Sequence, residues 1–185
     1  MKVNKNKAVF LDRDGVINKK ALKHDYVKKW KEFKFLPHVA EAIRIFNKKF
    51  LVIIVSNQRG IARGMMSKED VELINEKMSK ELEKKNARID GIYFCPHDDK
   101  DNCSCRKPKP GMLLKAAKDF KINLTESYMI GDDFADVEAG KRAGCETILV
   151  SNSKNIFSQK IRAKKSRPDY IVSNILEATK IIKIS

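Results

Sequence analysis

The sequence predicts an α/β protein with a doubly wound, mainly parallel sheet and helices on both faces. Short apolar runs of strand type alternate along the 185 residues with segments whose apolar residues recur at helical spacing. This alternation is typical of a parallel sheet covered on both faces. Several of the runs end in polar residues, which predicts a ligand site at the carboxyl ends of the strands.

We expect strands where short apolar runs meet polar or glycine residues. The run 51–55, Leu-Val-Ile-Ile-Val, is apolar throughout, as is typical of a strand buried on both faces. The expected strands are 7–11, 51–55, 92–94, 128–130, 147–150 and 170–172.

Helical spacing and capping residues place helices between the strands. Residues 37–50 have apolar residues at helical spacing, with Pro37 at the first turn. Ser67 can cap the next helix, with Glu69 or Asp70 in its first turn. The expected helices are 37–50, 67–85, 111–120, 133–143 and 174–182.

We expect residues 1–185 to form a single domain without a large cap domain. Residues 18–34 fit no regular element and follow the first carboxylates directly, so we expect them to form a flap over the pocket. Its aromatic residues Tyr26, Trp30 and Phe33 either anchor the flap or touch a ligand. His24 and His38 are expected to face solvent.

The composition is typical of a soluble globular protein, with 42% hydrophobic and 34% charged residues. No apolar run approaches the ~20 residues that cross a bilayer. The N-terminus is polar and has no apolar stretch of secretory type. We therefore expect a cytoplasmic monomer without a membrane partner.

The formal net charge of +15 raises the possibility of a nucleic-acid partner. The lysines are spread along the whole chain, and no aromatic residues interleave with them as stacking platforms would. A lysine-rich solvated surface is the favoured interpretation, and we expect no nucleic-acid partner. The alternative is a zinc-containing nucleic-acid-binding module without catalytic carboxylates.

The first strand ends in two carboxylates one residue apart, Asp12 and Asp14, followed by Gly15. One carboxylate can attack a phosphorus atom and share a Mg²⁺ ion with the substrate, while the other exchanges a proton with the leaving oxygen. Taken alone, the motif is equally typical of an acidic turn.

Two later loops can bind phosphoryl oxygens. Ser56 opens the run Ser-Asn-Gln-Arg-Gly-Ile-Ala-Arg-Gly, where a hydroxyl and backbone N–H groups can donate and Arg63 adds a cation. Arg106 and Lys107 lie beside prolines that stiffen the backbone, so they can form a fixed anion clamp. Each loop alone is also compatible with an ordinary surface loop.

The strand expected at 128–130 leads into Gly131 and Asp132, which adds a carboxylate at the same sheet edge. Mg²⁺ prefers oxygen ligands in octahedral geometry. We expect a Mg²⁺ site formed by Asp12, Asp132 and the backbone carbonyl of Asp14. Asp136, one helical turn further, is better placed to support the site than to bind the metal.

Four potential metal ligands lie close together in the sequence: Cys95, His97, Cys103 and Cys105. In a cytoplasmic protein such clustering indicates a metal rather than disulfides, and this ligand set suits tetrahedral Zn²⁺. We expect a structural zinc that fixes the loop 95–105 and positions the Arg106–Lys107 clamp. The lone Cys145 is expected to be a small buried residue.

The four strand-end motifs together resemble the haloacid dehalogenase superfamily of phosphatases, over about residues 7 to 150. The resemblance rests on Asp12-x-Asp14-Gly15, Ser56, Lys107 and Gly131-Asp132-x-x-x-Asp136. It implies Mg²⁺-dependent hydrolysis through an aspartyl-phosphate. The implied roles are nucleophile for Asp12, acid/base for Asp14, phosphoryl stabilisation for Ser56 and Lys107, and metal ligation for Asp132.

Within this superfamily, residues 10–18, 56–64 and 103–112 resemble the heptose bisphosphate phosphatases. The resemblance implies a small phosphorylated sugar as substrate, hydrolysed at the 7-phosphate of a heptose 1,7-bisphosphate. The residues expected to bind substrate are Arg13, Asn57, Gln58, Arg63 and Arg106.

Other phosphatase activities are open alternatives. The histidinol-phosphate phosphatases share the metal cluster and the Arg-Lys-Pro clamp, and the short loop 98–102 is more similar to theirs. The high positive charge also leaves a polynucleotide 3′-phosphatase as an alternative.

Overall fold

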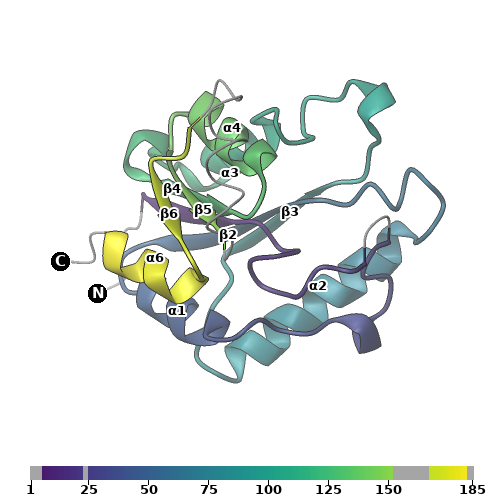
Figure 1. Ribbon diagram of the computed structural model, residues 1–185, viewed down its shortest axis with the longest axis horizontal. Helices are drawn as coiled ribbons and strands as arrows, with labels where there is room; N and C mark the ends of the chain where they lie inside the picture. The colour runs from purple at the N-terminus through teal and green to yellow at the C-terminus, as the bar shows by residue number, and fades with distance from the viewer. Residues whose placement is uncertain (1–5, 23–24, 152–166, 183–185) are drawn as a thin grey trace.

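The computed structural model describes residues 6–22, 25–151 and 167–182, and contains the expected parallel sheet (Figure 1). Its six strands are all parallel and lie in the order β3-β2-β1-β4-β5-β6. They are β1 Ala8–Leu11, β2 Leu51–Asn57, β3 Gly91–Cys95, β4 Tyr128–Gly131, β5 Glu146–Val150 and β6 Tyr170–Val172. Each lies within a few residues of the expected range.

Helices cover both faces of this sheet, as expected (Figure 1). The α-helices in the described ranges are α1 Val39–Phe46, α2 Lys68–Glu83, α3 Gly111–Phe120, α4 Phe134–Ala143 and α6 Ile175–Ile181. Three short 3₁₀ helices accompany them: η1 Trp30–Glu32, η2 Asp99–Asp101 and η3 Leu124–Glu126. No helix in these ranges is both long enough and apolar enough to cross a membrane.

The central strand β1 is buried on both faces and divides the core in two. Val9 and Leu11 join the apolar cluster of α1, α2 and α6, whereas Ala8 and Phe10 join that of α3 and α4. Successive strand side chains point to opposite faces. The tight anchoring of β1 therefore fixes the direction in which the chain enters Asp12.

Helix α1 is shorter than the sequence indicated, and the expectation of a helix over 37–50 is wrong at both ends. His38 has a left-handed backbone (φ 62°) immediately before the helix, so Pro37 lies outside it. At the other end, the Asn47 side chain accepts from Arg88 N at 2.8 Å and donates to Arg88 O at 3.0 Å. Asn47 thereby binds a neighbouring loop at the point where α1 stops. His38 is exposed, as expected, and His24 lies outside the described residues.

Two helices begin with reciprocal capping contacts. Ser67 accepts from Asp70 N at the start of α2, and Asp70 accepts from Ser67 N. Asp133 and Asp136 make the same exchange at the start of α4. The second cap matters for the site, because it fixes Asp136 directly after the end of β4.

The segment expected to form a flap has its two ends joined and packs on the core. Lys19 N donates to Lys34 O at 2.8 Å, which ties the two ends together. Phe33 is buried and stacks on Trp30, with ring centroids 5.0 Å apart. These aromatic side chains anchor the segment on the core, one of the two roles expected of them. Closure of the segment over a ligand stays a prediction.

Candidate active site

Three carboxylates and one lysine converge at the carboxyl ends of β1 and β4. Oxygen atoms of Asp12, Asp132 and Asp136 all lie within 4.8 Å of one another. Lys107 Nζ lies 2.7 Å from Asp12 Oδ1 and 2.6 Å from Asp136 Oδ1. The strands bring together residues up to 124 positions apart in the chain (136 − 12). The carboxyl edge of the sheet therefore carries the polar centre that the sequence predicts.

The positions of these groups shift their pKa values strongly. Burial raises the pKa of Asp12 to about 7, opposed by the positive charge of Lys107 and reinforced by Asp136. Burial also raises the pKa of Asp132 to about 6, against the attraction of Lys20. Burial alone would lower the pKa of Lys107. The negative charges of Asp12 and Asp136 have the larger effect and hold this pKa above its ordinary value. The three carboxylates of the site outnumber the two lysines that contact them, Lys107 and Lys20. Such an excess of negative charge favours the binding of a further cation.

The second carboxylate of the first motif, Asp14, is held from three directions. Asn18 Nδ2 donates to Asp14 Oδ1 at 2.8 Å, Gln58 Nε2 donates to Oδ2 at 2.8 Å, and Arg13 Nη2 lies 3.0 Å from Oδ2. The Asp14 side chain is nevertheless about one quarter exposed. A carboxylate fixed in this way and open to solvent is suited to exchange a proton with a bound molecule.

The exit of β2 places Ser56 in the site and gives its neighbours supporting positions. Ser56 is buried, and its Oγ accepts from Gln58 Nε2 at 2.7 Å. Asn57 brackets the backbone of Lys107: its Nδ2 donates to Lys107 O at 3.0 Å, and its Oδ1 accepts from Lys107 N at 3.1 Å. The amide of Asn57 thus fixes the loop that carries the lysine.

Three residues expected to bind substrate also have supporting contacts within the protein. Arg13 is 1% exposed, and its guanidinium contacts Asp14 and the buried Asn75, with Nη1 3.1 Å from Asn75 Oδ1. Gln58 is 1% exposed and is bound to Asp14 and Ser56. Arg13, Asn57 and Gln58 thus support the site through contacts within the protein, and substrate contact by these residues stays a prediction.

The cysteine cluster has the geometry of a metal site. The three sulfur–sulfur distances are 3.1, 3.4 and 3.5 Å, and His97 Nδ1 lies 3.3 Å from Cys105 Sγ and 3.6 Å from Cys95 Sγ. None of these cysteines forms a disulfide in the described chain. Four ligands converging from β3 and from the loop before Lys107 fit one tetrahedral ion. Cys145 is separate from the cluster and buried, as expected.

The arginines near this cluster are held by two adjacent acidic residues. Arg59 pairs with both Asp98 and Asp99, and its Nη1 lies 2.8 Å from Asp99 Oδ2. Arg63 lies 3.4 Å from Asp98 Oδ2, and Arg106 Nε donates to Asp99 Oδ1 at 2.6 Å. Three guanidinium groups therefore gather around the acidic pair Asp98–Asp99, next to the zinc-ligand candidates.

Sequence reasoning missed several residues of this site. Asn18 is completely buried and holds Asp14, and Lys20 lies 2.6 Å from Asp132. Asn75 supports Arg13 from the middle of α2. The position of Asn18, four residues after Asp14, was the one sequence feature that could have indicated its contact with Asp14. No local pattern marked Lys20 or Asn75.

Two hollows include residues of the site. One has a volume of about 490 Å³ and is lined by Gly15, Lys20 and Asp132, among others. The other, of about 200 Å³, includes Arg106, Lys107 and the acidic pair Asp98–Asp99. The carboxylate centre is therefore accessible from hollows that also carry cationic side chains.

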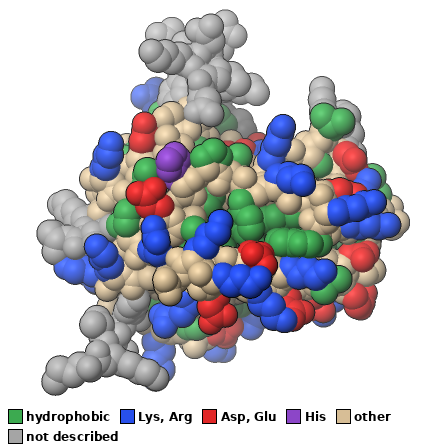
Figure 2. Space-filling view, turned by 90° about the horizontal axis from the view of Figure 1, so that it is seen from below, with side chains coloured by type: hydrophobic (Ala, Val, Ile, Leu, Met, Phe, Trp, Pro, Cys, Tyr) green, Lys and Arg blue, Asp and Glu red, His purple; other side chains and the backbone are tan. Residues whose placement is uncertain are grey.

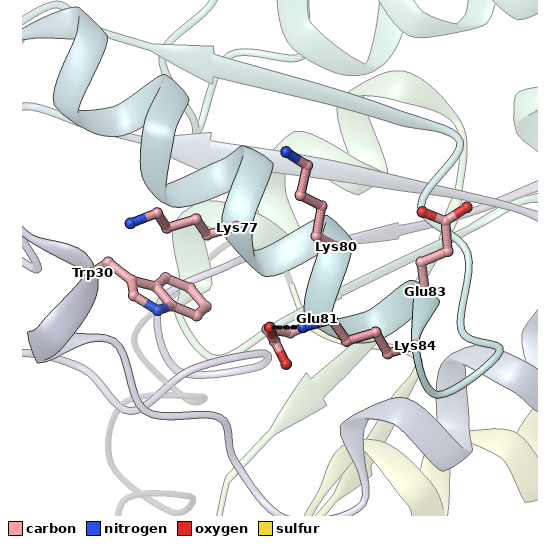
Figure 3. A pocket seen from close by; sticks show the side chains of 6 residues that line it. All are labelled: Trp30, Lys77, Lys80, Glu81, Glu83 and Lys84. Carbon is pink, nitrogen blue, oxygen red and sulfur yellow. Dashed lines mark hydrogen bonds and ion pairs between the residues drawn. The ribbon is translucent and has the colours of Figure 1, made fainter.

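A hollow of about 530 Å³ lies elsewhere, between Trp30 and the lysine-rich side of α2 (Figure 3). Its charged residues are partly paired locally: Lys84 lies 2.6 Å from Glu81, and Lys80 pairs with Glu76. The carboxylates of the strand-end centre are not among its lining residues. We assign it no part in the chemistry.

The surface view from below shows lysine and arginine side chains interspersed with acidic ones around an apolar area (Figure 2). The absence of a nucleic-acid partner stays a prediction.

The chain is similar in sequence to one class of enzyme. A family model described as HAD-hydrolase-like matches residues 104–178. The D-glycero-beta-D-manno-heptose-1,7-bisphosphate 7-phosphatase of Haemophilus influenzae is 38% identical over 186 residues, covering 96% of this chain and 97% of that protein. The D-glycero-alpha-D-manno-heptose-1,7-bisphosphate 7-phosphatase of Campylobacter jejuni is 42% identical over 151 residues, covering 81% and 85%.

Solved structures give the same result. The D,D-heptose 1,7-bisphosphate phosphatase of B. bronchiseptica, complexed with magnesium and phosphate, superimposes with a TM-score of 0.84. Its sequence is 29% identical, with 95% of this chain and 97% of that chain covered. A HAD-like phosphatase from Mesorhizobium loti gives a TM-score of 0.75 at 33% identity, with 80% and 74% covered. The resemblance inferred from the strand-end motifs is confirmed.

Proposed function

The chain belongs to the haloacid dehalogenase-like hydrolases, in the family of the heptose-1,7-bisphosphate 7-phosphatases, and we propose that it hydrolyses the 7-phosphate of D-glycero-D-manno-heptose 1,7-bisphosphate. The observation that carries this proposal is the contact of Lys107 with both Asp12 and Asp136, beside Asp132. A nucleophile, a cation and a metal-ligand carboxylate thus lie within reach of one phosphoryl group.

We assign the attack on phosphorus to Asp12. A free oxygen of its carboxylate forms the new P–O bond while the bond from phosphorus to the sugar oxygen breaks, which leaves an aspartyl-phosphate. Asp14, held by Asn18, Gln58 and Arg13, gives its proton to the departing sugar oxygen. Asp14 then accepts a proton from the water that cleaves the aspartyl-phosphate.

Two side chains are placed to stabilise the charge on the transferring group. Lys107 already contacts the attacking residue, so its ammonium lies beside the phosphoryl oxygens during transfer. The Ser56 hydroxyl accepts from Gln58 and retains its own proton for donation to a phosphoryl oxygen.

The site has the ligands that a Mg²⁺ ion requires. Asp132 Oδ1 is buried and has no hydrogen-bond partner in the described chain, as expected of an oxygen that awaits a cation. We propose that Asp12, Asp132 and the Asp14 backbone carbonyl hold the ion. Bound there, Mg²⁺ supplies charge neutralisation and orientation for the phosphoryl oxygens.

We propose that Zn²⁺ bound to the three cysteines and His97 has a structural role. All four protein positions are filled, so the site leaves no open coordination position for catalysis. The Cys105 ligand immediately precedes Arg106 and Lys107 in the sequence. Zinc held by these ligands would fix the loop that delivers the lysine to Asp12.

Replacing Cys103 by Ser tests the zinc assignment. We expect the purified variant to lose most of its zinc, measured by elemental analysis, and to melt several degrees below the wild type, because structural zinc contributes to folding free energy. The control is Cys145→Ser, which alters a buried cysteine outside the cluster. Full zinc content in Cys103→Ser would contradict the assignment.

The substrate assignment predicts a role for Arg106 in binding the phosphate that is not hydrolysed. We expect Arg106→Ala to raise KM for the heptose 1,7-bisphosphate about tenfold or more, because a charged hydrogen-bond partner is lost. KM for a sugar monophosphate should change little. The control is Arg88→Ala, an exposed arginine that pairs with Asp90 outside the site. Equal KM changes for both substrates would contradict this role.

A phosphate-release screen tests the proposed function as a whole. The substrates are both anomers of the heptose 1,7-bisphosphate, histidinol phosphate and a 3′-phosphorylated oligonucleotide, each with Mg²⁺. We expect the highest kcat/KM for a heptose bisphosphate. The named relatives include both anomers, so the anomer preference is decided by the assay itself. Highest kcat/KM for either of the other compounds would overturn the substrate assignment.

A further inference from the structure

Asp132 has two oxygens in different surroundings. Its Oδ2 lies 2.6 Å from the ammonium nitrogen of Lys20, whereas its Oδ1 is buried without a hydrogen-bond partner in the described chain. The Lys20 side chain is half exposed, and that of Asp132 is largely buried. A cation supplied by the chain itself therefore occupies one side of a carboxylate that we assign to the magnesium site.

The protein is shaped to allow this contact. A side chain at Gly15 would place its Cβ 2.1 Å from Asp132 Oδ2 and 2.7 Å from Lys20 Cε. Gly15 also has a positive φ of 111°, which other residues rarely adopt. The absence of a side chain at this position leaves the space in which Lys20 and Asp132 meet.

The backbone before Lys20 is fixed, so the reach of its side chain is well defined. Asn18 is completely buried and donates to Asp14 Oδ1 at 2.8 Å and to Lys19 O at 3.0 Å. Lys19 N donates to Lys34 O at 2.8 Å. Movement of the Lys20 ammonium therefore requires side-chain rotation and no rearrangement of this part of the backbone.

The charges of the centre divide between two lysines. Lys107 is buried and neutralises Asp12 and Asp136, and Lys20 faces Asp132 from the outside. A Mg²⁺ ion held by Asp132 would add a second cation to the carboxylate that Lys20 contacts. An ammonium 2.6 Å from the same carboxylate would then repel the ion at close range.

We propose that Lys20 is a built-in counter-ion of the magnesium site, which holds Asp132 Oδ2 and opposes the binding of Mg²⁺ at the free Oδ1. Lys20 thereby weakens Mg²⁺ binding and sets its affinity. This inference rests on the magnesium site of the proposed function. The hollow of about 490 Å³ beside Asp132, also lined by Lys19 and Asn174, gives the Lys20 ammonium room to move away from the ion.

Calorimetric titration of metal-free protein with MgCl₂ tests the proposal. Lys20→Met keeps most of the apolar stem and removes the ammonium, and Lys20→Gln is a second variant with a neutral polar end. The matched control is Lys19→Met, which removes the same charge one residue away and leaves the Asp132 contact in place. We expect both Lys20 variants to bind Mg²⁺ about fivefold more tightly than Lys19→Met, as the loss of a half-exposed ion pair permits.

Thermal melting gives a second readout that does not depend on activity. Metal-free Lys20→Met should melt below the wild type, since Asp132 loses its partner, and saturating MgCl₂ should raise its Tm more than that of the wild type. A gain of affinity cannot come from a merely damaged site. Equal Mg²⁺ affinity in Lys20→Met, Lys20→Gln and Lys19→Met would overturn the proposal while the magnesium site stands. Absence of Mg²⁺ binding to the wild type would overturn both.

Discussion

Replacing Asp12 by Asn is expected to reduce phosphate release on the order of 10⁴-fold or more, while the protein stays folded. The amide has nearly the same shape as the carboxylate but cannot form the acyl-phosphate bond, so the route through a covalent intermediate is closed. Retention of the fold follows from the surroundings of Asp12, whose charged form is disfavoured by burial and by the nearby Asp136. The neutral amide relieves that crowding.

The measurement is single-turnover phosphate release, with circular dichroism and zinc content as controls for folding. The Lys107–Asp136 contact remains available in the variant, so the Lys107 loop keeps an anchor. Turnover within tenfold of the wild type in a folded, zinc-containing Asp12→Asn protein would refute the assignment of the nucleophile.

Replacing Lys107 by Met is expected to affect both stability and catalysis. Its ammonium is almost completely buried and contacts Asp12 Oδ1, Asp136 Oδ1 and Val55 O at 2.6–2.8 Å. Removing one partner of a buried ion pair leaves an uncompensated charge, which typically costs about 3–5 kcal/mol. We expect a loss of this size in the free energy of unfolding of the metal-free protein, and a loss of activity of about 100-fold or more.

The loss of stability should depend on pH in a defined direction. In the folded wild type the pKa of Asp12 is about 7, and without Lys107 it rises above that value. Above pH 7 the folded variant therefore keeps a proton that the folded wild type and the unfolded chain have released. The stability of the variant continues to fall as pH rises above 7, so the deficit of Lys107→Met should be larger at pH 8 than at pH 5. Urea unfolding at both values measures it.

The control for this variant is Lys109→Met, in the same loop. Lys109 Nζ donates to Asn102 O at 2.9 Å and touches no carboxylate in the described chain. We expect Lys109→Met to lose little stability and to show no such pH dependence. If the two variants lose equal stability at both pH values, the buried contacts of Lys107 do not have the importance given to them here.

The strand ends were the most predictable part of this protein. The apolar run before Asp12 and the run before Asp132 each predicted a strand that delivers a carboxylate to the carboxyl edge, because parallel strands share that edge. The cysteine cluster was predictable from spacing alone. In both cases the signal lies in a few neighbouring residues, so a local pattern is sufficient to predict that they lie together.

The positions of single side chains were less predictable, because they depend on partners far away in the sequence. Arg13 lies between Asp12 and Asp14, and nothing local shows that its guanidinium is buried against Asn75, 62 residues later. Asn57 was expected to bind substrate, and its partner is the backbone of Lys107, 50 residues later. Lys20 lies in a segment without helical or strand periodicity, so no pattern indicated which way it points.

The end of α1 illustrates the same limit within secondary structure. The apolar spacing of 37–50 predicts a helix, and its apolar residues are indeed buried. Its length is decided by a left-handed residue at His38 and by the bonds of Asn47 to Arg88. The backbone conformation of His38 and the hydrogen bonds of Asn47 leave no trace in the spacing of apolar residues, on which the prediction of the helix rests.

The central claim is that Asp12 becomes covalently phosphorylated, and chemical trapping tests it most directly. Borohydride reduces an acyl phosphate to the alcohol, so quenching the enzyme with borohydride during turnover of the heptose bisphosphate should convert Asp12 to homoserine. Peptide mass spectrometry identifies the residue by its loss of mass. We predict the change at Asp12, only when substrate and Mg²⁺ are both present. Unmodified Asp12 during rapid turnover, or the change at Asp14 or Asp132 instead, would contradict the account.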